Sequence, residues 1–294
     1  MGEPAGGHDP VVEPRDPPPD DPAPTRRIAL GIAYDGSGYH GFAAQPGQRT
    51  VAGELAAALQ QMTGRAAVLT CAGRTDAGVH AVAQVVHADL DEAFLADHYP
   101  TAGLTPGCEL VALAGALSAQ LGPETAVWRA LVAPAGFDAR KSAIARRYRY
   151  DLEVAARPDP LRRGAVWHLE TPVELAAMRL AADALLGEHD FAAFCRRPPD
   201  RPEGPITRCV SDARFVLPGD GLVRFVIEAD AFCHQMVRSI VGALVAVGIG
   251  RLRPSDLVAL LAAADRQGAP SPAPPGGLCL VAVRYPEALT GTWS

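Results

Sequence analysis

The residues best suited to chemistry lie in one short run, Thr70–Ala81, with the sequence TCAGRTDAGVHA. Between Gly73 and Gly78 this run holds one arginine, one threonine and one carboxylate, Asp76. Glycine reaches backbone conformations that are closed to other residues, so such a loop can present the carboxylate into a cleft from rigid supports. The alternative is an ordinary tight turn in which Asp76 accepts hydrogen bonds from nearby amides. For an arbitrary Gly-x-x-Asp-x-Gly sequence that alternative is favoured.

A second feature is a basic cluster in the middle of the chain with tyrosines between its charges. Its members are Arg140, Lys141, Arg146, Arg147, Tyr148, Arg149 and Tyr150. Such a run is usually a solvated face, but interleaved aromatic rings also suit a surface that follows the phosphates of a nucleic acid. A Pro-rich stretch further along adds four candidate phosphate contacts, Arg196, Arg197, Arg201 and Arg208.

A third feature is the pair His234 and Arg238. Apolar residues recur at helical spacing through residues 236–247, and residues four apart lie on the same face of a helix. We therefore expect both side chains on one helix face. Taken alone, Arg238 is better explained as an exposed helix arginine.

Charge and composition narrow the class of protein. The net charge is −6, but residues 1–25 hold six acidic residues against one arginine, so the rest is nearly neutral and can present one basic face. Residues 1–26 are rich in Pro, Gly and Asp, which predicts a disordered acidic tail. No apolar run approaches the length of a bilayer span and the N-terminus does not resemble a secretory signal, so we expect a cytoplasmic protein.

The patterns of cysteine, histidine and glycine indicate neither a metal nor a cofactor. The six cysteines show no Cys-x-x-Cys spacing, so free thiols are expected. No histidine pairs with cysteine at metal-ligand spacing, and the chain has no Walker or Rossmann glycine pattern.

Hydrophobic periodicity divides the ordered chain into two halves, residues 27–135 and 136–294. For the first half we expect strands at 28–34, 67–71, 82–88 and 126–132 and helices at 51–62, capped by Thr50, and at 111–121. For the second half we expect strands at 148–154, 210–217, 222–229 and 278–283. We expect one helix that starts at Thr171, with Pro172 in its first position, and two more helices at 236–247 and 257–264.

Each half therefore has the order β-α-β-β-α-β, with one added helix in the second half. This order is that of the ferredoxin-like unit, and two such units side by side make an α+β protein with a cleft between them. The loop that carries Asp76 belongs to the first half, whereas Tyr148 and Arg238 belong to the second. Only a cleft between the halves would bring these residues together.

The run around Asp76 closely resembles a signature of the tRNA pseudouridine synthase A family, Gly-Arg-Thr-Asp-Ala-Gly-Val-His. Further segments resemble family blocks in the same order along the chain. They are Tyr34–Phe42, Phe137–Arg140 with Ala145–Tyr150, Gly187–Phe194, Phe232–Gly242 and Gly277–Val283. The resemblance spans about residues 27 to 286 and leaves out the acidic tail. It implies the pseudouridine synthase fold, with two ferredoxin-like halves and the active-site cleft between them.

The resemblance also implies roles for single residues. Asp76 corresponds to the catalytic nucleophile, Arg238 to its cationic partner and Tyr148 to the aromatic residue that stacks on the target base. Arg74 resembles the residue that helps to extrude this base from the RNA stack. The remaining RNA contacts expected from the resemblance and the basic cluster are Arg140, Arg146, Arg147 and His234.

The implied reaction is the isomerisation of uridine to pseudouridine in the anticodon stem-loop of tRNA, at positions 38, 39 and 40. The resemblance further implies a homodimer that uses no cofactor and no metal. Whether the carboxylate attacks the sugar or first assists an elimination stays open. Phe42 and Ala43 stand where the family usually has Trp-Gln, so other tRNA positions or other RNAs remain alternatives. A non-catalytic RNA-binding protein is the alternative from another class, but it would not need Asp76 together with Arg238.

Overall fold

The computed structural model describes residues 24–99, 105–197, 204–219 and 221–290. In this part of the chain, ten strands form one mixed sheet in the order β4-β1-β3-β10-β5-β9-β8-β7, with β2 paired to β3 and β6 paired to β5. The first-half strands are β1 (Thr25–Tyr34), β2 (Thr70–Cys71), β3 (His80–Asp91) and β4 (Thr125–Val132). The second-half strands are β5 (Ala145–Val154), β6 (Trp167–Leu169), β7 (Gly187–Asp190), β8 (Thr207–Gly219), β9 (Leu222–Ala229) and β10 (Leu278–Arg284).

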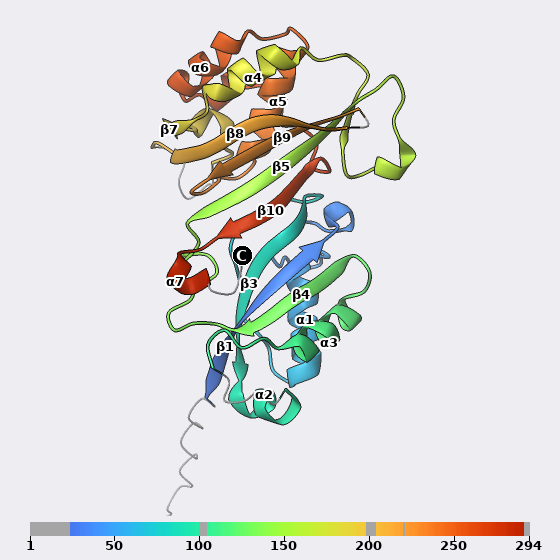
Figure 1. Cartoon of the computed structure of the whole chain (residues 1–294), viewed down its shortest axis with the longest axis vertical. Coiled ribbons are helices and arrows are strands. Elements are labelled where there is room, and N and C mark those ends of the chain that lie inside the picture. The colour runs from blue at the N-terminus through green and yellow to red at the C-terminus, as the bar shows by residue number, and fades with distance from the viewer. Residues whose placement is uncertain (1–23, 100–104, 198–203, 220, 291–294) are drawn as a thin grey trace, which may run out of the picture.

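Both halves show the strand order of a ferredoxin-like unit, which confirms the predicted α+β class. Across the sheet, the strands of the first half lie in the order β4, β1, β3 and β2. The strands of the second half lie in the order β10, β5, β9 and β8. The halves are stacked along the long axis of the molecule, and β10 meets β3 between them (Figure 1). The predicted division between residues 135 and 136 falls in the segment that joins β4 to β5. The first half therefore ends after β4, and the second half begins before β5.

Except for the last one, the helices pack beside the strands of their own half, whereas Leu289 of the last helix packs against a cluster that holds Ala29, Val85 and Leu131 of the first half (Figure 1). They are α1 (Val51–Thr63), α2 (Glu92–His98), α3 (Val111–Leu121), α4 (Leu175–Asp183), α5 (Met236–Gly248), α6 (Pro254–Ala263) and α7 (Glu287–Thr290). The Thr50 side chain caps α1 by accepting a hydrogen bond from the Gly53 N–H, as predicted. In the described chain, no helix is long and apolar enough to cross a membrane.

The start of α4 was predicted wrongly. The helix begins at Leu175 and not at Thr171, because the Glu174 carboxylate caps it by accepting from the Ala176 N–H. The Glu174 N–H donates to the Gly248 carbonyl at 2.8 Å, which fixes the preceding segment against the end of α5. Pro172 therefore lies outside the helix. The short elements α2, β6 and β7 were also not predicted.

The predicted acidic tail lies almost entirely outside the described residues. β1 begins at Thr25, two residues earlier than the predicted start of the ordered chain. Nothing in the structure tests the prediction for residues 1–23.

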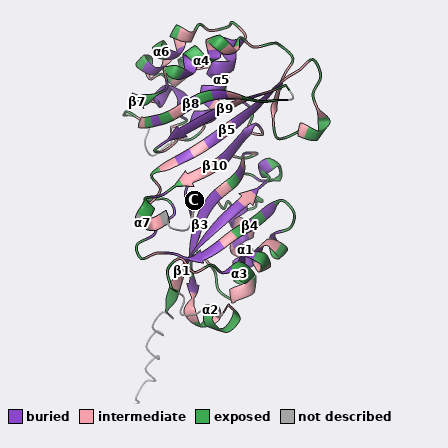
Figure 2. Ribbon diagram, viewed as in Figure 1, coloured by how far each residue is buried: buried purple, intermediate pink, exposed green. Residues whose placement is uncertain are grey.

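Alternation along β5 decides which side chains can reach the interior (Figure 2). Arg146, Tyr148 and Tyr150 are buried on one face of the strand. Arg147 and Arg149 point to the opposite face, where Arg147 Nε lies 2.8 Å from a carboxylate oxygen of Glu228. The predicted basic cluster is therefore split between the two faces of the sheet.

Candidate active site

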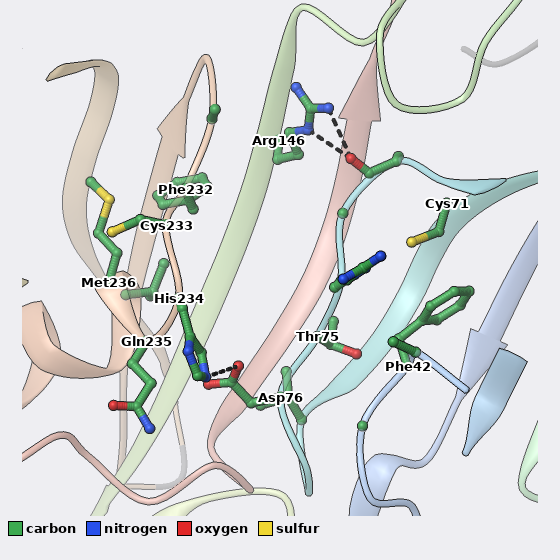
Figure 3. A pocket seen from close by; sticks show the side chains of 18 of the residues that line it. Phe42, Cys71, Thr75, Asp76, Arg146, Phe232, Cys233, His234, Gln235 and Met236 are labelled. Carbon is green, nitrogen blue, oxygen red and sulfur yellow. Dashed lines mark hydrogen bonds and ion pairs between the residues drawn. The ribbon is translucent and has the colours of Figure 1, made fainter. Parts of the chain in front are cut away.

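The loop that carries Asp76 connects β2 to β3 at the junction of the two halves. β3 begins at His80, and β10 of the second half pairs with its first residues. The loop lines a cleft of about 1590 Å³, together with the segment that precedes α5 (Figure 3). Residues from both halves therefore face one cavity, as the arrangement of two ferredoxin-like units predicted.

Buried side chains of the first half hold this loop from beneath. Gln84 Nε2 donates to the Gly73 carbonyl at 2.6 Å, and the Tyr34 hydroxyl shares a hydrogen bond of 2.8 Å with Thr75 Oγ1. The Phe42 N–H donates to the Thr75 carbonyl at 3.1 Å. Because these contacts fix the loop backbone, they determine where its next side chains point.

Arg74 and Asp76 flank the buried residue Thr75 in this loop. Arg74 is exposed, and Asp76 is partly exposed toward the cleft. Gly78, just beyond Asp76, adopts a φ of +76°, a conformation that favours glycine, whereas Gly73 does not. The loop therefore presents its cation and its carboxylate to the cavity.

The Asp76 carboxylate lies between two side chains of the second half. Arg238 Nη1 donates to Asp76 Oδ2 at 3.2 Å, and His234 Nε2 lies 3.4 Å from Oδ1. The Arg238 guanidinium is itself held by a hydrogen bond of 2.8 Å from Nε to the Ala273 carbonyl. The structure thus brings together three residues that are up to 162 positions apart.

His234 reaches Asp76 by a different route from the one predicted. It precedes α5, which begins at Met236, so it does not share a helix face with Arg238. Gln235 between them adopts a left-handed φ of +64°, which is uncommon for a residue other than glycine. This turn directs His234 toward the carboxylate (Figure 3).

The segment before α5 is also fastened to the loop that precedes β8. Cys195 and Cys233 form a disulfide, and the Arg196 N–H donates to the His234 carbonyl at 2.9 Å. The expectation of free thiols is therefore wrong for these two cysteines, which are 38 residues apart in sequence. The free cysteines are Cys71, Cys108, Cys209 and Cys279.

Tyr148 completes the group around Asp76. Its ring packs edge-on against Phe232, with ring centroids 5.1 Å apart and an interplanar angle of 86°. Only 7 % of the residue is exposed, yet it lines the cleft. Burial is the main cause that raises the pKa of the Tyr148 hydroxyl, and the charge of Asp76 adds to it. The hydroxyl is therefore protonated at neutral pH.

Cys71 is the other candidate nucleophile in the cleft. Burial raises the pKa of its thiol to about 11, although the charge of Arg74 opposes the shift. Because the thiolate is the reactive form of cysteine, a thiol with this pKa is inert at neutral pH. This leaves Asp76 as the candidate nucleophile of the cleft.

The cleft is strongly basic although the chain as a whole is acidic. Seven arginines line it: Arg74, Arg140, Arg146, Arg196, Arg197, Arg208 and Arg238. Among the lining residues in the described part of the chain, Asp76 is the single acidic one. Such a concentration of positive charge in a groove attracts a polyanion.

The chain is similar in sequence to known proteins over most of its length. A family model described as tRNA pseudouridine synthase matches residues 181–286. The chain is 44% identical to tRNA pseudouridine synthase A of Streptomyces griseus over 269 residues, which cover 88% of each chain. It is 43% identical to the protein of the same name from Chromobacterium violaceum, over 89% of this chain and 94% of that one.

The chain belongs to the tRNA pseudouridine synthase A family. Among solved structures it also resembles a crystal structure of a Cbf5-Nop10-Gar1 complex, with 11% identity and a TM-score of 0.35, over 86% of this chain and 48% of that chain.

Three residues that support the site were given no role in the sequence analysis, although two of them lie in segments that resemble family blocks. Tyr34, Gln84 and Phe232 fix the loop and Tyr148, but none was predicted as a site residue. Gln84 gave one signal, because it is a polar residue inside an apolar strand and is fully buried. The contact between Phe232 and Tyr148 joins positions 84 apart and left no signal in the sequence.

The predicted RNA contacts differ in where they lie. Arg74 and Arg140 are exposed in the cleft, and His234 lies on its wall. Arg146 lines the cleft but is buried, whereas Arg147 is absent from the cleft and is paired with Glu228. Arg201 lies outside the described residues. Within the described residues, no group of three or more histidine, cysteine or acidic side chains could hold a metal ion.

Proposed function

We propose that this chain isomerises uridine to pseudouridine in tRNA, with Asp76 at the reacting centre. The observation that carries the proposal is the Asp76 carboxylate, 3.2 Å from Arg238, in a cleft lined by seven arginines. Family membership supplies the reaction, and the geometry supports the assignment of the residues. The fixed guanidinium places a positive charge beside the carboxylate that either form of the chemistry uses.

The reaction breaks the bond between uracil N1 and ribose C1′, turns the base and joins C5 to C1′. The proton on C5 leaves, and N1 gains a proton, so the product is an isomer of the substrate. Asp76 either attacks C1′ as a nucleophile or begins by assisting an elimination at the sugar. Neither route needs a cofactor.

In this proposal Tyr148 stacks on the uracil that enters the cleft, and its protonated hydroxyl serves as a hydrogen-bonding group near the base. The exposed Arg74 fills the gap that the base leaves in the RNA stack. Extruding a base from a stem costs a few kcal/mol. The basic cleft compensates for part of this cost through contacts with phosphates.

The phosphate contacts that we propose are the accessible arginines of the cleft rim, Arg140, Arg196, Arg197 and Arg208. The predicted contact by Arg147 does not fit this surface, because its guanidinium lies on the other face of the sheet. His234 lies against Asp76, so we propose that it lines the site of the reacting nucleotide.

Two finer assignments, modification at positions 38, 39 and 40 of the anticodon stem-loop and a homodimer, rest on family resemblance alone. The proposed cytoplasmic location rests on the sequence, in which no apolar run is long enough to span a bilayer. Mapping pseudouridines in tRNA from a strain that lacks the gene tests the positions directly. Loss of modification at other positions in the tRNA would show that the protein modifies those positions instead.

The reaction itself is tested by release of tritium from tRNA that carries uridine labelled at C5. The wild-type protein should release the label, and Asp76→Asn should not, although both bind tRNA. A wild-type protein that binds tRNA and releases no tritium would show that the chain is a binding protein without this activity.

A further inference from the structure

The guanidinium of Arg146 is buried and fully engaged with backbone carbonyls. Arg146 is 9 % exposed. Nε and Nη2 donate to the Ala72 carbonyl at 3.2 and 2.8 Å (Figure 3). Nη2 also donates to the Arg140 carbonyl at 2.8 Å. Nη1 donates to the carbonyls of Ala143 and Asp230 at 3.0 and 2.8 Å. One side chain thus makes five hydrogen bonds and has no donor directed at the cleft.

These carbonyls belong to three separate parts of the site. Ala72 stands at the start of the loop that carries Asp76. Arg140 and Ala143 lie in the connection between the halves. Asp230 follows β9 and leads directly into the segment that carries Phe232 and His234. The guanidinium therefore ties the loop of the first half to the segment of the second half that contacts Asp76.

Arg146 also stands two residues before Tyr148 on the same face of β5. Through Arg146, the strand that carries Tyr148 is bonded to the loop that carries Asp76. This link adds to the sheet pairing of β5 with β10 and of β10 with β3.

The acceptors of Arg146 are all neutral carbonyls. Burial lowers the pKa of the guanidinium, but arginine remains charged in proteins. A buried cation without a carboxylate partner carries a desolvation cost. The five hydrogen bonds offset this cost, and they do so by joining separate parts of the site.

We propose that Arg146 is a positioning residue that sets the Asp76 loop against Tyr148 and the His234 segment, and that it makes no contact with RNA phosphate. The proposal rests on the proposed function, since its main readout is pseudouridine formation. It replaces the role in RNA binding that the position of Arg146 in a basic cluster suggests.

The first experiment separates positioning from phosphate binding with Arg146→Lys and Arg146→Met. At saturating tRNA, the single-turnover rate of both should fall by about 100-fold or more, the loss expected from a misplacement of about 1 Å. The dependence of tRNA affinity on salt should stay as in the wild type. A lost phosphate contact would instead flatten the slope of log K against log salt by about 0.7 to 0.9. Lysine keeps the charge but cannot span the four carbonyls, so it should rescue little.

Two comparison variants make this result specific. Arg140→Met removes an exposed arginine of the same cleft and should flatten the salt slope. Arg224→Met removes a partly buried arginine on the opposite sheet face, where it donates to Asp151 at 2.6 and 3.0 Å. Arg224→Met should lose stability and keep its rate per folded molecule. An Arg146→Met protein with a normal rate and a flattened salt slope would overturn the proposal.

The second experiment uses the wild-type protein, so it gives an answer even if the Arg146 variants do not fold. Phenylglyoxal modifies accessible arginines, and mass spectrometry locates the sites with and without tRNA. Arg74 and Arg140 should react and be protected by tRNA, whereas Arg146 should not react in either state. Reaction of Arg146 as fast as Arg74, with protection by tRNA, would overturn the proposal. A wild-type protein without activity would instead count against the proposed function, while the labelling would still decide the position of Arg146.

Discussion

The ion pair between Arg238 and Asp76 allows a quantitative test of the site. Arg238 Nη1 lies 3.2 Å from Asp76 Oδ2, and the side chains are 16 % and 22 % exposed. Two unit charges about 4 Å apart attract by about 1 kcal/mol in water and about 4 kcal/mol at an effective dielectric constant of about 20. Low exposure favours the upper value, and the desolvation of both groups removes part of it. We therefore expect Arg238→Met to cost about 2–3 kcal/mol, a loss of about 30- to 150-fold in rate.

The assay is single-turnover formation of pseudouridine at saturating tRNA, because binding is then complete and the rate reports on the chemistry. Arg238→Met should lower this rate by the stated factor, with an unchanged Kd for tRNA within about threefold. Arg238→Lys keeps the charge but loses the planar guanidinium that also donates to the Ala273 carbonyl, so its rate should fall less.

Arg266→Met is the matched control for the loss of an arginine beside α5. Arg266 donates to Ser239 Oγ at 2.7 Å, next to Arg238 in sequence, but it does not line the cleft. It should therefore keep the single-turnover rate of the wild type. An Arg238→Met protein as fast as Arg266→Met would refute the reasoning, since the chemistry would then not depend on the cation beside Asp76.

The remaining predictions concern the carboxylate, the RNA surface and the buried tyrosines. Asp76→Asn should reduce turnover by about 10³ or more and leave tRNA binding in place; multiple turnover by the purified variant would remove Asp76 from the chemistry. Arg208→Met should flatten the salt dependence of tRNA binding, whereas Arg147→Met on the opposite face of the sheet should not. The reverse result would show that tRNA binds to the face that carries Arg147. Burial raises the pKa of Tyr150 and Tyr285 above 10, so the unfolded chain loses these protons first as pH rises. The free energy of unfolding should then fall above about pH 10 by about 1.4 kcal/mol per pH unit for each tyrosine, and Tyr150→Phe should reduce that slope in urea titrations; a flat profile would contradict it.

Much of the fold could be predicted because the strands and helices carry clear periodic patterns. α3 has the predicted bounds, and α1 begins at the predicted cap. The prediction for the start of α4 was wrong for a physical reason. The local sequence offers a good helix start at Thr171, but the Glu174 N–H donates to the Gly248 carbonyl, and the helix begins only at Leu175. A tertiary contact of this kind is invisible in a local pattern.

In the site, too, features that depend on neighbouring residues could be predicted, whereas contacts between distant residues could not. Asp76 could be proposed as a site residue because its neighbours are contiguous in sequence, and Arg238 because the late-helix segment resembles a family block. Arg147 was misplaced although the sequence held the answer: with Tyr148 toward the cleft, alternation puts Arg147 on the other face. The disulfide between Cys195 and Cys233 had no local signal, because it joins residues 38 positions apart.

The alignment of the two halves is the condition on which the chemistry depends, because Asp76 comes from one half and its partners from the other. Direct pairing between β3 and β10 is limited to two residue pairs, Cys279 with His80 and Leu280 with Ala81. So short a parallel ladder fixes an angle between two halves only weakly. The bonds of Arg238 to Asp76 and of Arg146 to Ala72 cross the same junction, a few residues away. These side chains therefore act on the alignment as well as on the reacting carboxylate. Substitutions that leave the junction intact, such as those of Arg224 and Arg266, are for that reason the controls that separate a loss of alignment from a general loss of stability.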